Sequence, residues 1–250
     1  MPRKLVVFGG NGFVGSRIAR AAVHRGWNVI VACRSGAPFG LVGEWLTGTQ
    51  FVAIDALSRE QVNLFFGDNP DIDAVVTTIG LLTPRHVDAR RVNGDAAVNI
   101  TAGIMAMPQV RKLVFVSAEP YSLLDRTVLK GYFYGKQLAE KAMLEHLGDR
   151  AVVFRPGMVY GLRKTTYGPT LPLGVIGAPL EVALRPMYHI TNKFSWLVPP
   201  VSVEDLADAA ITAIMEPSVH GIHDYDAIKA LAKRVPPEVQ WSSERSRLDS

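Results

Sequence analysis

The sequence predicts an α/β protein built on a doubly wound parallel sheet with helices on both faces. Short apolar runs of strand length alternate with helical stretches along most of the chain. A glycine-rich turn follows the first apolar run, and polar or glycine residues follow most of the later ones. Parallel strands need right-handed crossovers, so helices cover both faces, and ligands bind beyond the carboxyl ends of the strands.

The length and the composition of the chain are those expected of a single globular domain. The chain has 250 residues, of which 48% are hydrophobic and 20% are charged, as in an ordinary globular protein with a large core. We expect a single domain over residues 1–235 and a loose polar tail over 236–250. Residues 160–200 are rich in Pro and Gly and interrupt the alternation, which predicts a small C-terminal substrate-region insertion, or lid.

The charge balance and the cysteine count narrow the function classes. The net charge is +4, the pI is about 9.2, and the basic residues are dispersed, so we expect no nucleic-acid partner. Cys33 is the only cysteine, so no internal disulfide can form. His189 and His220 have no ligand-spaced partners, and we expect no metal. No signal or transit peptide and no transmembrane segment is expected.

The expected elements follow the chain in order. Strands are predicted at 5–8, 27–32, 51–54, 74–79, 112–116 and 151–154. Helices are predicted at 16–24, 58–66, 87–107, 131–147 and 203–216. Ser58 and Ser202 are expected N-caps, because a hydroxyl there can accept from a free N–H of the first turn. Gly148 is an expected C-cap.

The glycine-rich turn predicts a dinucleotide site. It contains Gly9, Gly10, Asn11, Gly12, Phe13, Val14 and Gly15, and fits both G-x-x-G-x-x-G and G-x-G-x-x-G. Glycines there allow a tight turn, close approach of the backbone to a pyrophosphate and close packing of helix on strand. The pyrophosphate would bind free N–H groups at the helix N-terminus. The alternative is a tight strand–helix turn without a ligand.

Residues at two later strand ends bear on the choice of nucleotide. Arg34 comes 19 residues after Gly15, about where NAD-selective folds place a carboxylate for the ribose 2′-OH. Arg34 and Ser35 supply donors for a 2′-phosphate instead, so we expect NADP(H) ahead of NAD(H). Asp55 either accepts from the adenine amino group or serves as a turn residue at the entry to a helix.

Four residues form the candidate catalytic set. Tyr132 and Lys136 are four residues apart on a predicted helix and share a face. A nearby ammonium is expected to lower the pKa of the phenol, which then exchanges a proton with a carbonyl or alcohol oxygen. Ser117 ends the preceding strand and is expected to orient that oxygen, while Asn93 either holds a water or bends its helix. The alternative is an ordinary aromatic helix with a surface lysine.

These motifs together resemble the short-chain dehydrogenase/reductase superfamily. The resemblance covers residues 4–230 and rests on the glycine turn, Phe-Val-Ser at 115–117, Tyr132-x-x-x-Lys136, Arg-Pro-Gly-Met-Val-Tyr-Gly at 155–161 and Val-Glu-Asp-Leu-Ala at 203–207. The last two are similar to the extended and atypical branches. A Rossmann-type fold and a bound nicotinamide dinucleotide are implied. Further contacts to that cofactor are expected from Ile79, Gly80, Arg155, Pro156 and Gly157.

A closer resemblance rests on two proline-containing segments, residues 172–180 and 199–205. They are similar to small atypical members of mitochondria and plastids. Those members are related to the ubiquinone-biosynthesis reductase-like protein of fungi and to the nucleotide-binding accessory subunit of respiratory complex I. A mitochondrial location is implied, with plastid or cytoplasm as alternatives. The uncharged run 165–180 either packs over the cofactor or contacts an isoprenoid or quinone substrate, a membrane surface or a protein partner.

Two functions therefore stand as hypotheses. The first is an NAD(P)-dependent oxidoreductase acting on a carbonyl or alcohol of a small or isoprenoid/quinone-type substrate. The second is a non-catalytic accessory or assembly subunit of a mitochondrial complex, in which the nucleotide stabilises the fold.

Overall fold

Seven parallel strands form the main sheet, in the order β3-β2-β1-β4-β5-β6-β11. They are β1 (Lys4–Phe8), β2 (Asn28–Cys33), β3 (Thr49–Ala53), β4 (Ala74–Thr77), β5 (Lys112–Val116), β6 (Ala151–Phe154) and β11 (Gly221–His223). The computed structural model describes residues 3–38, 40–120, 129–163, 171–172, 174–191 and 198–234. This strand order is that of a Rossmann-type fold, as the sequence predicts.

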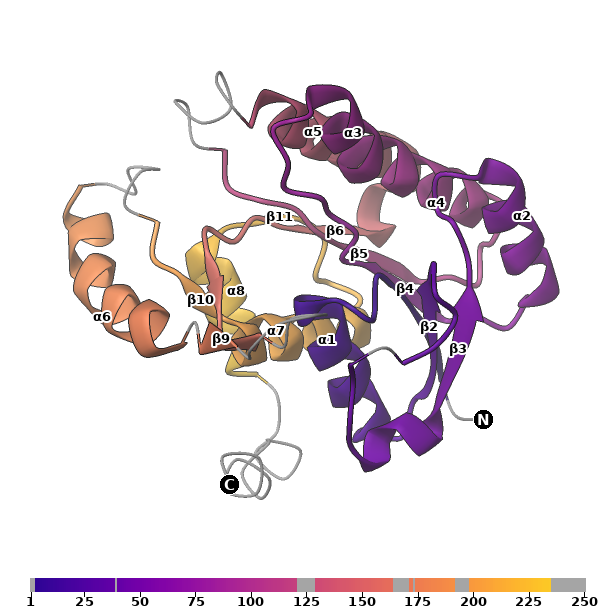
Figure 1. Cartoon of the computed structure of the whole chain (residues 1–250), viewed down its shortest axis with the longest axis horizontal. Coiled ribbons are helices and arrows are strands. Elements are labelled where there is room, and N and C mark those ends of the chain that lie inside the picture. Colours follow the sequence, from indigo (N-terminus) through magenta and orange to yellow (C-terminus); the bar gives the residue numbers. More distant parts are fainter. Residues whose placement is uncertain are drawn as a thin grey trace.

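Helices cover both faces of the sheet (Figure 1). One face carries α1 (Phe13–Val23), α7 (Val203–Met215) and α8 (Tyr225–Ala232). The other carries α2 (Arg59–Asp68), α4 (Ala96–Met105) and α5 (Lys130–Leu147). The helices α3 (His86–Arg90) and α6 (Gly174–Ile190) lie near the carboxyl edge of the sheet. Two short strand pairs lie there as well. In one, β7 (Val159–Tyr160) pairs with β10 (Val201–Ser202), and in the other, β8 (Leu162–Arg163) pairs with β9 (Leu171–Pro172).

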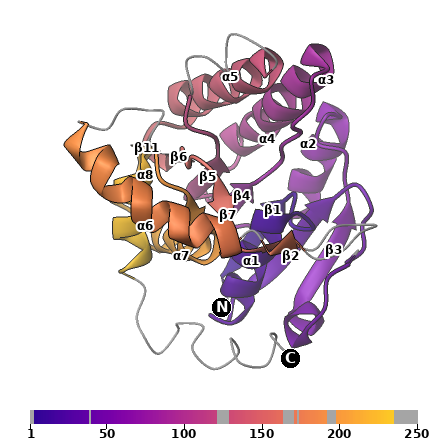
Figure 2. The ribbon, with the colours of Figure 1, turned by 60° about the vertical axis from the view of Figure 1, so that its left-hand side comes forward.

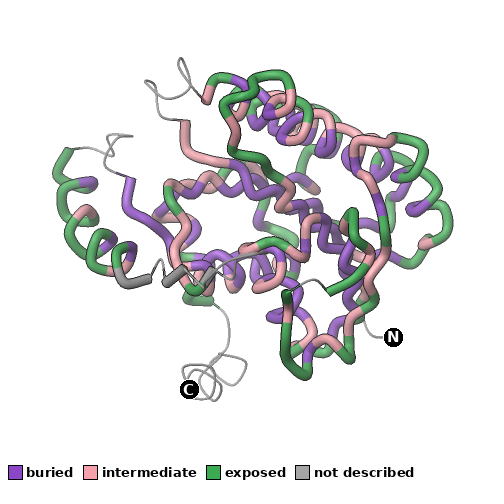
Figure 3. Tube along the Cα trace, viewed as in Figure 1, coloured by how far each residue is buried: buried purple, intermediate pink, exposed green. Residues whose placement is uncertain are grey.

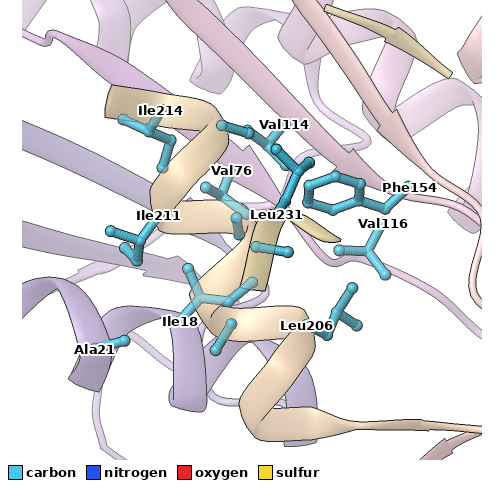
Figure 4. Packing of buried hydrophobic residues seen from close by; sticks show 14 of the residues in the cluster. Ile18, Ala21, Val76, Val114, Val116, Phe154, Leu206, Ile211, Ile214 and Leu231 are labelled. Carbon is cyan, nitrogen blue, oxygen red and sulfur yellow. The ribbon is translucent and has the colours of Figure 1, made fainter. Parts of the chain in front are cut away.

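The alternation of side chains along the strands creates two cores. In β1, Leu5 and Val7 join the core under α1 and α7, whereas Val6 and Phe8 join the core under α2, α4 and α5. Because both faces are covered, the central strands β1, β4, β5 and β6 are buried on both sides, which explains the uninterrupted apolar runs of the sequence. Figure 4 shows the first core, where Leu206 and Ile211 of α7 lie among strand residues.

Several boundaries match their predictions. The strands at 112–116 and 151–154 have the predicted ends. Ser58 and Ser202 are N-caps, since each hydroxyl accepts from the backbone N–H three residues on. The α1 helix begins at Phe13, three residues earlier than predicted, so the glycine turn continues directly into the helix. The predicted tail at 236–250 lies outside the described residues, as do 165–170 and 173 of the uncharged run.

Two parts of the chain differ from the predictions. The stretch 87–107 is not one helix, because a π-helical turn, η2 (Arg91–Asp95), separates α3 from α4. Residues 174–190 form the helix α6 despite Pro179 and Pro186, and most of α6 is exposed (Figure 3). Figure 2 shows β7 beside α6, and the buried Glu181 joins them by accepting from the Tyr160 hydroxyl at 2.6 Å. None of the described helices is long and apolar enough to cross a membrane.

Glycines allow α5 to approach the α3–η2 segment at backbone distance. A Cβ added to Gly131 would lie 2.2 Å from the carbonyl oxygen of His86, and one on Gly135 would lie 2.7 Å from that of Arg90. A Cβ on Gly94 would lie 3.0 Å from the Gly135 carbonyl oxygen. No larger side chain fits these positions, so the crossing fixes the position of α5 against the neighbouring helix.

We expect Gly135→Ala to lower the free energy of unfolding by about 1–3 kcal/mol, because the added methyl group meets backbone atoms that cannot rotate away. The matched control is Gly67→Ala in α2, where a Cβ meets nothing within 4 Å. That change should be neutral or stabilise the helix by about 0.5–1 kcal/mol. Urea unfolding of the two variants checks the prediction, and equal midpoints would contradict it.

Candidate functional site

The sheet divides between β1 and β4, where successive crossovers run in opposite directions. The N–H of Thr78, just past β4, donates to the Phe8 carbonyl oxygen at 3.0 Å, and its hydroxyl donates to the same oxygen at 3.2 Å. The glycine turn after β1 and the segment Thr78–Ile79–Gly80 after β4 therefore lie side by side. In doubly wound sheets this switch point is where ligands bind.

The glycine turn has the geometry of a phosphate cradle. Gly9 has φ +79°, and the N–H of Gly12 donates to its carbonyl oxygen at 2.9 Å. A Cβ on Gly15 would lie 2.5 Å from that oxygen, so α1 packs close against the turn. A Cβ on Gly12, the N-cap of α1, would meet only the Gly9 carbonyl oxygen at 3.1 Å, which leaves this backbone open to a ligand.

The first turn of α1 contains Phe13, Val14 and Gly15 and has no acidic residue. The N–H groups of a first turn lack acceptors within the helix and carry the positive end of its dipole. The residues of the turn thus fit the pyrophosphate of a dinucleotide. Gly10 does not face the ligand side, since a Cβ there would lie 2.7 Å from a methyl group of Val31.

Asn11 joins the glycine turn to the segment after β2. Its amide donates to the Ser35 hydroxyl at 2.9 Å and to the Ala37 carbonyl oxygen at 2.6 Å. Arg34 lies in this segment and is exposed. The structure thus brings Ser35 to the glycine turn, with the exposed Arg34 directly before it in the chain.

Asp55 follows β3, at the edge of the sheet. One of its carboxylate oxygens accepts from the Leu57 N–H at 3.0 Å, and its own N–H donates to the Gln61 side chain at 2.9 Å. These bonds form the turn that leads into α2. They match the turn-residue alternative for Asp55, and one carboxylate oxygen remains for a further contact.

Lys136 is the buried cation of the site. Its side chain is 4% exposed, and its ammonium donates to the carbonyl oxygens of Val116 at 2.8 Å and Ile79 at 3.2 Å. It also lies 4.6 Å from the centre of the Phe115 ring. Burial lowers its pKa to about 7, although Glu140 acts in the opposite direction. The ammonium thus connects α5 with the ends of β4 and β5.

Tyr132 lies one turn before Lys136, whose ammonium is 5.8 Å from the centre of the Tyr132 ring. Burial raises the pKa of Tyr132 to about 12. The expectation that Lys136 lowers this pKa is therefore not met in this structure, because burial desolvates the phenol and disfavours its ionised form. At neutral pH the Tyr132 hydroxyl is protonated and can donate.

Ser117 is buried at the end of β5, and its hydroxyl donates to a carboxylate oxygen of Glu140. Arg155 binds the same carboxylate, with its Nε 3.2 Å from each oxygen. Sequence reasoning missed Glu140. The available signal was its position four residues after Lys136 on the same helix face.

Asn93 lies in the π-helical turn and is fully buried. Its amide donates to the carbonyl oxygens of Leu81 at 2.9 Å and Ala89 at 2.8 Å, and its own oxygen accepts from the Leu81 N–H at 3.3 Å. Asn93 thus holds the segment that follows Gly80. Gly80 itself lies beside the Lys136 side chain. The π-helical turn agrees with the expected distortion of this helix.

The turn after β6 lies beside these residues. The carbonyl oxygen of Pro156 accepts from the N–H of Glu119 at 2.9 Å, which connects the ends of β5 and β6. Burial raises the pKa of Glu119, and Arg155 opposes the shift. Gly157 continues the turn and is partly exposed. Among the described residues, no group of three His, Cys, Asp or Glu side chains could hold a metal ion.

The fold and the site define a class: Rossmann-type α/β proteins with a cradle for a dinucleotide phosphate and a Tyr/Lys pair at the same sheet edge. A family model described as "NAD dependent epimerase/dehydratase family" matches residues 5–226. The chain therefore belongs to this family, which is the extended branch of the resemblance drawn from the sequence.

Two relatives show how far sequence similarity extends. An uncharacterized chloroplastic protein of Arabidopsis thaliana is 35% identical over 240 residues, which cover 93% of this chain and 78% of the relative. The protein named MIOREX complex component 2 of Saccharomyces cerevisiae is 35% identical over 83 residues, covering 32% of this chain and 29% of the relative.

Solved structures share the fold at low identity. The Bordetella bronchiseptica enzyme WbmH in complex with NAD+ has a TM-score of 0.64 at 22% identity, covering 93% of this chain and 80% of that one. The UDP-glucose 4-epimerase of Thermus thermophilus, in complex with NAD, has a TM-score of 0.63 at 20% identity, covering 92% and 81%.

The lowered pKa of Lys136 predicts how stability depends on pH. Between pH 7 and the ordinary lysine value of 10.5, the unfolded chain binds a proton at Lys136 that the folded chain has lost. The free energy of unfolding should therefore rise with pH in this window. Lys136→Met removes the effect, so the wild type should gain stability relative to this variant as the pH rises.

Urea unfolding of both proteins across this window measures the difference. The control is Lys141→Met, on the same helix, whose side chain is 71% exposed. Its difference from the wild type should stay constant with pH. A constant difference for Lys136→Met as well would contradict the prediction.

Proposed function

We propose that this protein is a nicotinamide-dinucleotide-dependent oxidoreductase that acts on a carbonyl or alcohol carbon of a small or isoprenoid/quinone-type substrate. The observation that carries the proposal is the position of Lys136. Its buried ammonium binds the ends of β4 and β5, next to the phosphate cradle, while Tyr132 lies one turn away with a protonated hydroxyl.

Each residue would have a distinct task. A bound nicotinamide dinucleotide supplies or accepts the hydride. Tyr132 gives a proton to the substrate oxygen in reduction and takes it back in oxidation. Lys136 would hold the nicotinamide ribose through its ammonium. The N–H groups at the start of α1 hold the pyrophosphate.

Apolar side chains near the pair support an apolar substrate. Leu82, after β4, is 67% exposed, and Met158, after β6, is 45% exposed. Leu81, which precedes Leu82 in the chain, is held in place by Asn93. Large apolar side chains exposed at a ligand-binding edge are typical of binding surfaces.

Tyr132→Phe should abolish turnover and preserve nucleotide affinity, because it removes only the hydroxyl that moves the proton. The matched control is Tyr134→Phe, two residues along the same helix, where Tyr134 is 54% exposed. Oxidation of NADPH in the presence of a short-chain quinone or an aldehyde panel measures turnover, and fluorescence titration measures affinity. Equal rates for the Tyr132→Phe variant and the wild type would overturn this role.

NADP(H) is proposed ahead of NAD(H), because Arg34 and Ser35 lie beside the glycine turn. Arg34→Ala should weaken NADPH binding roughly tenfold to a hundredfold, the effect of losing a charged hydrogen-bond donor worth about 1.5–3 kcal/mol. NADH has no 2′-phosphate, so its affinity should not change and serves as the internal control. Equal losses for both nucleotides would contradict the preference.

A second candidate function is a nucleotide-stabilised accessory or assembly subunit of an organellar complex. The yeast relative is named as a complex component, and α6 presents exposed apolar side chains, Ile176, Val182 and Ile190 among them. The name of the plant relative, which includes the word chloroplastic, supports a plastid location for this protein. The resemblance drawn from the sequence implies a mitochondrial location as the alternative. Native purification distinguishes the two proposed functions, because a subunit would co-purify with a large assembly and retain its nucleotide.

A further inference from the structure

Lys136 and Glu140 form an unusual pair of buried charges. They lie one turn apart on α5, at 4% and 5% exposure. Such neighbours commonly form an ion pair. Here the ammonium binds two backbone carbonyl oxygens, while the carboxylate binds the Ser117 hydroxyl and the Arg155 guanidinium. Each charge therefore holds a different part of the sheet edge.

The bonds of Glu140 decide what Ser117 can do. A serine hydroxyl has one proton to donate and lone pairs to accept with. An ionised carboxylate only accepts, so the Ser117 proton is directed at Glu140. Ser117 can then accept a hydrogen bond, but it has no proton left for a substrate carbonyl. The proton that reaches a substrate oxygen must come from Tyr132.

Glu140 also controls the charge balance around Lys136. The ionisable groups beside the ammonium are Tyr132 and Glu140 on α5. Glu119 after β5 and Arg155 after β6 interact with Glu140, while Asn93 of η2 is neutral. Glu140 thus lies one helical turn from Lys136 and is bonded to Arg155. Without its charge, Lys136 would lose its neighbouring carboxylate, and Arg155 would keep only its interaction with Glu119.

We propose that Glu140 is a positioning residue that orients the Ser117 hydroxyl away from the substrate and favours the charged form of Lys136 where the dinucleotide ribose binds. The proposal rests on the proposed nucleotide binding and extends it to a residue that does not touch the ligand. If the Glu140 carboxylate only stabilised the fold, replacing it by the neutral amide would not change the pH dependence of nucleotide affinity.

The test measures NADPH affinity as a function of pH for the full-length wild type and for Glu140→Gln. A charged Lys136 binds ribose hydroxyls more strongly, so affinity should fall as the pH rises through the Lys136 transition. Glu140 raises the Lys136 pKa, so its neutralisation should move the midpoint to lower pH. Glu140→Asp keeps the charge and should retain a midpoint near that of the wild type.

The matched control is Glu145→Gln, on the same helix, whose carboxylate is exposed and pairs with Lys141 at 3.8 Å. It should leave the profile unchanged. Identical profiles for Glu140→Gln and Glu145→Gln would overturn the proposal while leaving nucleotide binding intact. If Glu140→Gln does not fold, the double variant Glu140→Gln/Arg155→Gln removes both charges of the ion pair. Because Arg155 is itself an expected cofactor contact, the readout is then the midpoint of the profile and not the affinity, and the midpoint should still move to lower pH. A wild type that binds neither NADPH nor NADH would overturn the proposed function and this inference with it.

Discussion

The site depends on one buried ammonium that is held by backbone carbonyl oxygens. Lys136 reaches the carbonyl oxygens of Val116, which ends β5, and Ile79, two residues past the end of the neighbouring strand β4. A desolvated ammonium without such acceptors would be costly, so these bonds are what allow α5 to place a cation there. The same bonds hold the Ile79–Gly80 segment beside the glycine turn.

The packing of α5 against the neighbouring helical segment fixes the position of Lys136. Gly131 and Gly135 contact the backbone of the neighbouring helical segment, and each directly precedes a candidate catalytic residue, Tyr132 or Lys136. The rotation of α5 is set by the close crossing, because turning the helix would bring larger side chains against backbone atoms. The π-helical turn lies at this crossing and contains Asn93, which holds the segment after β4 from the other side.

The fold and the phosphate cradle were predictable because their signals are local. Apolar runs of strand length, the glycine spacing and the serine N-caps are each read within a few residues. The bonds that decide the chemistry are not local. Lys136 finds its acceptors 20 and 57 residues away in sequence, and Glu140 binds Ser117 across 23 residues. The helix α6 was missed because Pro179 and Pro186 indicate a loop, whereas tertiary contacts at Glu181 and Tyr188 hold a helix there.

The turn that follows β6 connects α5 with α6, because each end of the turn binds a carboxylate of one of these helices. Arg155 begins the turn and binds Glu140 of α5, and Tyr160 ends it and donates to Glu181 of α6. Glu181 also accepts from the hydroxyl of Tyr225 and binds Lys229, both on α8. A shift of α6 would therefore pull on the segment that carries Arg155, which is the partner of the carboxylate beside Lys136. A substrate or partner that contacted α6 would therefore meet a helix whose Glu181 is bonded to the same turn that carries Arg155. This connection is compatible with both proposed functions, because it joins α6 to the candidate site whether or not the site turns over a substrate.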